Sequence, residues 1–227
     1  MSETSAADLQ WSPARRPERT PLEGAHVRLE PLDPSRHQIG LWVAADEPEI
    51  WRYLPYGPYA DETALAAQLA VDAASEDPLF FAVIDLRDGR AGGVASYLRI
   101  TPEHGVIEIG HIWFGRTLQR TRAATEVIYL LARHAFDDLG YRRLEWKCNA
   151  ANAASRRAAE RFGFTFEGIF RQHQIVKGQN RDTAWYAMLD HEWPPIRAAF
   201  EAWLHGANFD ADGRQRRRLS EIRLSRP

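Results

Sequence analysis

The chain has 227 residues, of which 44% are hydrophobic and 26% are charged, and its formal net charge is −2. This length can bury a full core without disulfides or a structural metal, and the near-neutral charge excludes a global field that draws the molecule to nucleic acid or an anionic membrane. A single cysteine, Cys148, excludes an internal disulfide framework.

The composition along the chain divides it into three parts. Residues 1–21 are polar and rich in proline and arginine, so we expect a flexible N-terminal arm. A single domain is expected over residues 22–204, followed by a polar, basic tail over residues 205–227. Neither a secretory signal nor a membrane-spanning segment is evident, and we expect a cytoplasmic protein.

The first half of the domain alternates between extended and helical patterns. A strand is predicted at 26–30, helices at 35–45, 49–54 and 61–75, and strands at 79–86, 91–100 and 106–114. Asp61 is a plausible N-cap. The strand at 79–86 is almost wholly apolar, as a central strand buried on both faces would be.

The second half continues with a long amphipathic helix at 122–139, which Gly140 ends. A strand at 143–148, a helix at 153–161, strands at 165–176 and 183–189, and a helix from Pro194 to Leu204 follow. These elements predict an α/β (α+β) fold, with a mixed, mostly antiparallel sheet of about seven strands and helices on both faces.

The junction between the strand at 106–114 and the long helix is suited to binding an anion. The first turn of a helix offers unpaired N–H groups and a partial positive charge. Small side chains at Ala123 and Ala124 would let phosphate oxygens approach, while Arg116, Arg120 and Arg122 add charge. The alternative is a helix start with solvated arginines, and local chemistry favours neither interpretation.

A resemblance to a family rests on this junction. Gln119-Arg120-Thr121-Arg122-Ala123-Ala124 resembles the Q/R-x-x-G-x-G/A acetyl-CoA loop of the GNAT (GCN5-related) N-acetyltransferases. Arg122 stands where the family usually has glycine. Its backbone amide can still serve if the helix has begun there, since α-helical geometry does not require glycine.

A second block strengthens the resemblance. Residues 152–164, from Asn152 and Ser155 to Glu160-Arg161-Phe162-Gly163-Phe164, are similar to the family's N-x-x-S/A…E-K/R-x-G-F signature. The continuation to Arg171 looks like the RimJ/RimL branch, which acetylates protein N-termini and assorted small amines. The resemblance covers residues 22–189 and implies a GNAT fold with acetyl-CoA as co-substrate and splayed strands at the acyl-CoA site.

The resemblance also implies roles for single residues in cofactor binding. The expected contacts are the backbones of Trp113 and Phe114 with the pantetheine arm, and Gln119, Arg120, Thr121, Arg122, Ala123, Ala124 and Thr125 with the pyrophosphate. Asn152 contacts the pantetheine or simply caps a helix. Many members carry a tyrosine as thiol acid where this chain has Ala159. Ser155 is the expected substitute, with a helix-start serine that contacts backbone as the alternative.

Two side chains are candidates for the general base. Glu108 lies between Ile107 and Ile109, so desolvation is expected to raise its pKa; the alternative is a rim glutamate in a surface ion pair. His111 competes, because an imidazole titrates near neutrality. Strict alternation along the strand puts the two on opposite faces, so only one is expected to face the cleft unless the strand bulges.

An aromatic run is the candidate acceptor wall. Trp51, Tyr53, Tyr56 and Tyr59 lie around Pro55 and Gly57-Pro58, and could enclose an amine by cation–π contact or simply pack the loop onto the sheet. Tyr186 and Asp182 are weaker acceptor-site candidates.

We therefore expect an acetyl-CoA-dependent N-acetyltransferase that acts on a small-molecule amine or a peptide N-terminus. Direct transfer in a ternary complex is expected, because neither motif contains a cysteine. The alternatives are a non-catalytic CoA-binding sensor or scaffold, and an RNA-associated factor that uses the basic residues 214–218. Nucleic acid is the less favoured partner, a homodimer is left open, and no metal is expected because the histidines are scattered.

Overall fold

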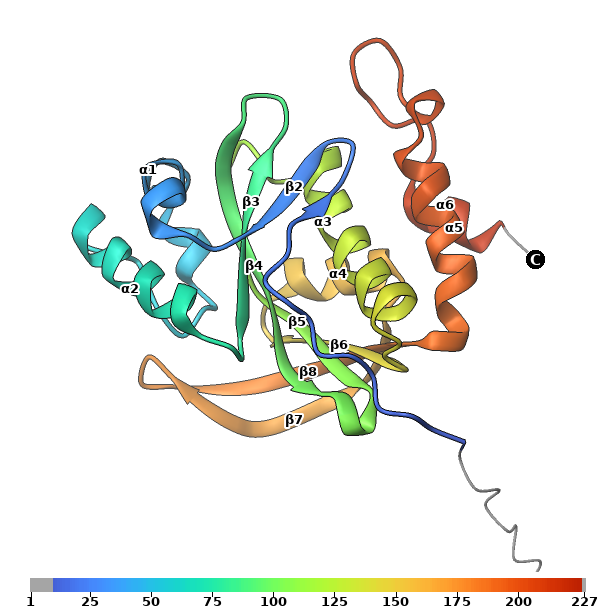
Figure 1. Ribbon diagram of the computed structural model, residues 1–227, viewed down its shortest axis with the longest axis horizontal. Coiled ribbons are helices and arrows are strands. Elements are labelled where there is room, and N and C mark those ends of the chain that lie inside the picture. Colours follow the sequence, from blue (N-terminus) through green and yellow to red (C-terminus); the bar gives the residue numbers. More distant parts are fainter. Residues whose placement is uncertain (1–9, 226–227) are drawn as a thin grey trace, which may run out of the picture.

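The computed structural model describes residues 10–225, and in it one sheet of eight strands forms the centre of the molecule (Figure 1). The strands are β1 (Leu22–Glu23), β2 (Val27–Pro31), β3 (Leu79–Asp85), β4 (Arg90–Thr101), β5 (Val106–Phe114), β6 (Arg143–Asn149), β7 (Thr165–Val176) and β8 (Gln179–Leu189). Their order is β1-β2-β3-β4-β5-β6-β8-β7, and only β5 and β6 pair in parallel. The predicted mixed, mostly antiparallel sheet is confirmed, with the two-residue β1 as an additional strand.

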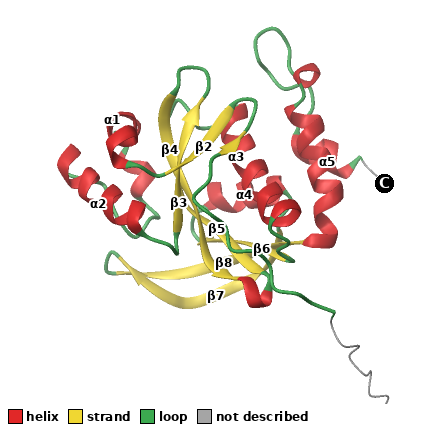
Figure 2. Cartoon of the chain, in the orientation of Figure 1, coloured by secondary structure: helices red, strands yellow, loops and turns green. Residues whose placement is uncertain are grey.

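Helices cover both faces of the sheet, as predicted (Figure 2). The helices are α1 (Pro34–Ala44), α2 (Glu62–Ala74), α3 (Arg122–Arg133), α4 (Ala153–Phe162), α5 (Trp193–Leu204) and α6 (Leu219–Leu224), with a short 3-10 helix η1 (Pro48–Trp51). Asp61 caps α2, because its carboxylate accepts from the N–H of Ala64 at 2.8 Å. Among residues 10–225, no helix combines the length and apolar character that crossing a membrane requires.

Alternation along the central strand separates two apolar cores. β3 is buried along its whole length, as predicted. Phe80 and Ala82 face α1 and α2, whereas Phe81 and Val83 face the larger core beneath α3, α4 and α5. Each face of the sheet thus has its own helical layer. Successive side chains of a strand point to opposite faces, so neighbouring residues pack against different layers.

The described part of the N-terminal arm is held against the domain. The indole N–H of Trp11 donates to the carbonyl of Glu103 at 2.9 Å, and the backbone N–H of Arg15 donates to the carbonyl of Leu139 at 2.9 Å. Residues 10–21 therefore do not form the free arm that the sequence suggested. Residues 1–9 of the predicted arm lie outside the described residues.

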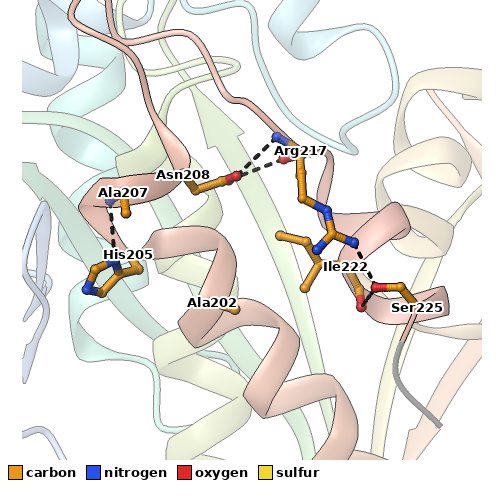
Figure 3. Close-up of a pocket in the computed structure, with 7 residues that line it drawn as sticks. All are labelled: Ala202, His205, Ala207, Asn208, Arg217, Ile222 and Ser225. Carbon is orange, nitrogen blue, oxygen red and sulfur yellow. Dashed lines mark hydrogen bonds between the residues drawn. The ribbon is translucent and has the colours of Figure 1, made fainter.

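The predicted polar tail also folds back onto the domain. Leu219 and Ile222 of α6 are buried in the larger core. The carboxamide of Asn208 pins the connecting segment, accepting from the N–H of Arg217 at 3.0 Å and donating to its carbonyl at 3.2 Å (Figure 3). Alongside these contacts lies a pocket of about 530 Å³ between α5 and α6. The expectation of a solvated tail is thus wrong for residues 205–225, because the two apolar residues of α6 bind it to the core.

This packing predicts the effect of two matched substitutions in α6. The side chain of Leu219 is 1% exposed and that of Leu224 is 81% exposed. Leu219→Ala should therefore lower the free energy of unfolding by about 2–5 kcal/mol, since it leaves a cavity in the core. Leu224→Ala should change it by less than about 0.5 kcal/mol. Urea titration followed by tryptophan fluorescence measures both values, and equal stability in the two variants would contradict the placement of α6.

Candidate active site

The parallel strand pair opens into a gap. β5 and β6 pair from Val106 opposite Arg143 to Ile109 opposite Trp146, and no further. β5 nevertheless continues to Phe114 and β6 to Asn149. The edges of residues 110–114 and 147–149 therefore face each other without ladder hydrogen bonds, which is the splayed arrangement that the sequence resemblance implied.

A β-bulge accompanies this divergence. Ser96 of β4 pairs with Gly110 and Val94 pairs with Trp113, so β5 carries one residue more than β4 across this interval. His111 has a φ of 49°, in the left-handed region. The extra residue rotates the imidazole onto the face that carries Glu108. The expectation from strict alternation, that these two side chains lie on opposite faces, is therefore wrong.

His111 is packed among aromatic groups on that face. Its Nδ1 lies 3.1 Å from the hydroxyl of Tyr56, and the two rings stack with centroids 5.6 Å apart. Phe80 contacts the imidazole edge-on. Burial lowers the pKa of His111, and the charge of Arg181 lowers it further. The imidazole is therefore neutral near pH 7, with no hydrogen bond from Nε2 to another described residue.

Glu108 is buried and held by two cations. Its Oε2 lies 2.9 Å from Nζ of Lys147 and 3.2 Å from Nε of Arg99. Burial raises the pKa of Glu108, and the ammonium of Lys147 opposes that change. The carboxylate is thus in an ion pair, as the alternative interpretation held, but in a buried one.

The ion pair belongs to a longer network. Lys147 also contacts Oε2 of Glu145 at 2.5 Å, and its Nζ lies 3.9 Å from the ring centroid of Trp185. Glu145 is bound in turn by Arg143 at 2.8 Å. Alternating charges across neighbouring strands compensate one another, which allows carboxylates to remain buried here.

The start of α3 presents free backbone donors at the end of β5. Thr121 is the N-cap and its hydroxyl accepts from the N–H of Ala124 at 3.1 Å. Arg122 is the first helical residue, so its backbone amide is available although the family usually has glycine at this position. Among the described residues, none accepts from the backbone N–H groups of Arg122 and Ala123. These two donors and the helix dipole can hold an anion.

The side chains of this loop are tied to neighbouring segments. Gln119 Nε2 donates to the carbonyl of Phe114 at 2.8 Å, which fixes the loop to the end of β5. The guanidinium carbon of Arg122 lies 3.4 Å from the ring centroid of Phe209, in the segment that precedes α6. Arg120 is exposed, whereas Ala123, Ala124 and Thr125 are buried, so only part of the predicted loop presents side chains to solvent.

The start of α4 lies across the gap. Asn152 caps the helix, because its Oδ1 accepts from the N–H of Ser155 at 3.0 Å. The indole N–H of Trp146 donates to Oγ of Ser155 at 3.0 Å. Trp146 belongs to the last parallel pair, so Ser155 lies where the strands separate, and its hydroxyl also interacts with the thiol of Cys148. Cys148 is buried, and burial raises the pKa of its thiol, as expected for a core cysteine.

The aromatic segment after α1, residues 51–59, is held beside the gap by two hydrogen bonds. The hydroxyl of Tyr53 donates to the carbonyl of Ala151 at 3.2 Å, which connects η1 to the loop before α4. Lys177, at the tip of the β7–β8 hairpin, donates to the carbonyl of Trp51 at 2.7 Å. Trp51 itself is buried against Trp113, so Tyr53 and Tyr56 are the members that approach the gap.

Tyr186 does not join the other acceptor-site candidates. It is fully buried beneath α4, where its hydroxyl contacts Arg156 at 3.2 Å and Glu160 at 3.3 Å. That position is on the opposite face of the sheet from His111 and Glu108. Asp182 accepts the backbone N–H of Gln172 at 2.7 Å and so shapes the hairpin. Both weaker candidates thus have structural contacts elsewhere.

The structure adds residues that the sequence did not indicate, namely Arg99, Lys147, Trp185 and Arg181 on the face of Glu108. The charged alternation Glu145-Trp146-Lys147 within β6 is the one signal that could have pointed to them. Across residues 10–225, no group of three or more His, Cys, Asp or Glu side chains is arranged to hold a metal ion.

Comparison with known proteins agrees with this architecture. Residues 26–165 match the acetyltransferase (GNAT) domain family. The crystal structure of a GCN5-related N-acetyltransferase from Brucella melitensis is 48% identical, covers 95% of this chain and 99% of its own, and superimposes with a TM-score of 0.93. A GNAT-family protein from Chromobacterium violaceum is 42% identical, covers 85% of this chain and 98% of its own, and gives a TM-score of 0.78.

Curated relatives are more distant. The ribosomal-protein-serine acetyltransferase of Escherichia coli is 30% identical over 97 residues, which are 43% of this chain and 54% of the relative. YdaF of Bacillus subtilis, named a putative ribosomal N-acetyltransferase, is 30% identical over 108 residues, 48% of this chain and 58% of the relative. The chain thus spans little more than half the length of these two relatives.

The buried network predicts the cost of removing its central cation. Lys147→Met should lower the free energy of unfolding by about 3 kcal/mol, because Glu108 and Glu145 would each lose a partner while keeping an arginine. Arg214→Met breaks an exposed pair with Asp212 and should cost less than about 0.5 kcal/mol. Chemical denaturation of both variants tests this, and a neutral Lys147→Met would contradict the network.

Proposed function

The chain belongs to the GNAT acetyltransferase family, and we propose that it transfers an acetyl group from acetyl-CoA to a primary amine of a small molecule or a peptide N-terminus. The gap between β5 and β6 is the observation that carries the proposal. It has free amide donors of α3 at one end and the neutral imidazole of His111 on one face. An extended acyl carrier with an anionic end fits such a channel.

Cofactor binding is assigned to backbone groups. The free N–H groups of Arg122 and Ala123 would hold the pyrophosphate, supported by the helix dipole. The open edge of β5 at Trp113 and Phe114 would bind the amides of the pantetheine arm, because these residues lie beyond the last parallel pair. The acetyl thioester would then lie near the bulge, where the gap begins.

His111 is the better of the two base candidates. A base must release and accept a proton without leaving buried charges unpaired. Protonating Glu108 would leave Lys147 and Arg99 facing a neutral acid, whereas His111 is already neutral. When Nδ1–H donates to the hydroxyl of Tyr56, Nε2 carries a lone pair that can take the proton of the attacking amine.

The leaving thiolate needs a proton donor on the other side of the gap. The hydroxyl of Ser155 would meet this need, because the Trp146 indole occupies one of its lone pairs and its O–H, which interacts with the Cys148 thiol, can turn to the sulfur of CoA. A donated N–H also makes the hydroxyl a stronger donor through hydrogen-bond cooperativity. The amine would therefore attack the thioester carbon, His111 would take the amine proton, and Ser155 would protonate or hydrogen-bond the sulfur.

The relatives suggest where to look for the acceptor. One is named for acetylation of a ribosomal-protein serine, so peptide N-termini belong in the substrate screen together with small amines. The aromatic residues Tyr53 and Tyr56 would line the entry for the amine. The transfer is expected to be direct, since the cysteine near the gap, Cys148, is buried with a raised thiol pKa.

Substitution distinguishes the two base candidates. His111→Gln should lower kcat about 100-fold with CoA affinity retained, because it removes the proton acceptor. Glu108→Gln should lower kcat much less, since its carboxylate holds cations. Release of CoA thiol under saturating acetyl-CoA measures kcat, and calorimetry measures affinity. A larger kcat loss in Glu108→Gln than in His111→Gln would assign the base to Glu108.

Charge reversal tests the pyrophosphate loop. Arg120→Glu should weaken binding of CoA and acetyl-CoA about tenfold, because a negative charge would face the phosphates. Arg142→Glu makes the same change at an exposed position where β6 begins, and should leave affinity unchanged. Isothermal titration measures both. Equal affinities would contradict this cofactor site, while normal CoA binding without turnover on any amine would favour the sensor or scaffold alternative.

A further inference from the structure

Arg181 lies beside the acceptor side of the gap and has no role in the proposed reaction. It is on β8, opposite Gln174 of β7 and beyond the last residue that β8 pairs with β6. Regular alternation places it on the same face as Trp185, which contacts Lys147. Its charge is close enough to His111 to lower the pKa of that imidazole.

The guanidinium of Arg181 has no partner among the described residues. Its Nε is buried without a hydrogen bond, and no described carboxylate lies within 4.0 Å. The other cations of this face are compensated, since Arg99 and Lys147 both contact Glu108. Arg181 is thus the surplus charge in an otherwise balanced cluster.

A partly buried cation without an ion-pair partner is costly to retain. Partial burial lowers the pKa of Arg181, and the nearby charge of Glu108, which it does not contact, opposes this change without outweighing it. A hydrophobic residue at this place in β8 would avoid that cost. A cation that destabilises the fold is typical of a binding site, where a ligand supplies the anion that the protein lacks.

CoA is not positioned to provide that anion. The free donors for its pyrophosphate belong to α3, which lies on the opposite face of the sheet from Glu108 and Arg181. The acceptor reaches the gap from the face of His111 and Tyr56. A partner for Arg181 must therefore come with the acceptor.

We propose that the acceptor is an amine that also carries a carboxylate, and that Arg181 binds this carboxylate while His111 meets the amine. One guanidinium fits one carboxylate in charge, and its fork of N–H donors matches the two oxygens. The carboxylate belongs either to a free amino acid or to an acidic side chain near a peptide N-terminus. This inference rests on the proposed acetyl transfer.

The experiment compares acceptors that differ only in the anion. L-Methionine is compared with L-methioninamide, L-aspartate with L-asparagine amide, and Ser-Asp-Ala-Ala amide with Ser-Asn-Ala-Ala amide. Turnover is followed as CoA thiol release, and binding to the CoA-loaded protein is followed by calorimetry. The acidic member of at least one pair should have a kcat/KM about 10- to 100-fold higher, mainly through KM. The pair that shows the preference identifies the source of the carboxylate.

Variants assign the preference to Arg181. Arg181→Met should abolish the preference, measured as the ratio of acid to amide kcat/KM within each pair at one pH, and Arg181→Lys should retain part of it. Arg171→Met is the matched control, because Arg171 is exposed on the neighbouring β7. Arg181→Met should also raise the unfolding temperature, since it removes a partly buried charge that has no ion-pair partner.

The outcomes separate this inference from the proposed function. Equal turnover and binding of acids and amides by the native protein, or a preference that persists in Arg181→Met, would overturn the inference. A lower unfolding temperature in Arg181→Met would also count against it, since it would mean that the charge is compensated. Binding of acids that depends on Arg181, but without turnover, would support the inference and refute acetyl transfer.

Discussion

The separation of β5 from β6 after four residue pairs is the constraint on which the site depends. The additional residue at the bulge lets β5 follow β4 while β6 follows β8, and the sheet divides between them. Gly93 permits this geometry, because a Cβ there would lie 2.4 Å from the carbonyl oxygen of Trp113. The same bulge turns His111 to the face that carries Glu108, so the open strand edge and the position of the proposed base arise from one irregularity.

Much of the fold could be predicted from local patterns. β5 begins and ends at the residues that hydrophobic periodicity predicts, and α3 begins at the predicted residue, because these signals act over a few residues. The terminal segments could not be predicted in this way. Residues 10–21 and 205–225 are mostly polar in sequence, so both were expected to be solvated. In the second segment, Leu219 and Ile222 pack into the larger core, a contact that depends on the folded domain and not on the local sequence.

The geometry of the candidate site was predictable where it depends on consecutive residues and not where it depends on neighbouring strands. The loop from Gln119 to Thr125 carries its own signature, since backbone amides at a helix start need no distant partner. The face occupied by His111 depends on pairing with β4, and the ion pair of Glu108 depends on Lys147, which is 39 residues away along the chain. Sequence alternation alone therefore misplaced His111 relative to Glu108, and no local pattern pointed to Arg181.

The contact between Phe209 and Arg122 has a consequence for the order of assembly during translation. The proposed cofactor loop, residues 119–125, is synthesised before Phe209, which stacks on Arg122, and α6 reaches the core only once Ile222 has left the ribosome. Until then the apolar surfaces of α3, α4 and α5 that receive Leu219 and Ile222 stay uncovered, which exposes the nascent domain to association with other chains. The packing of Phe209 against Arg122, and with it the final form of this loop, is therefore completed late in synthesis.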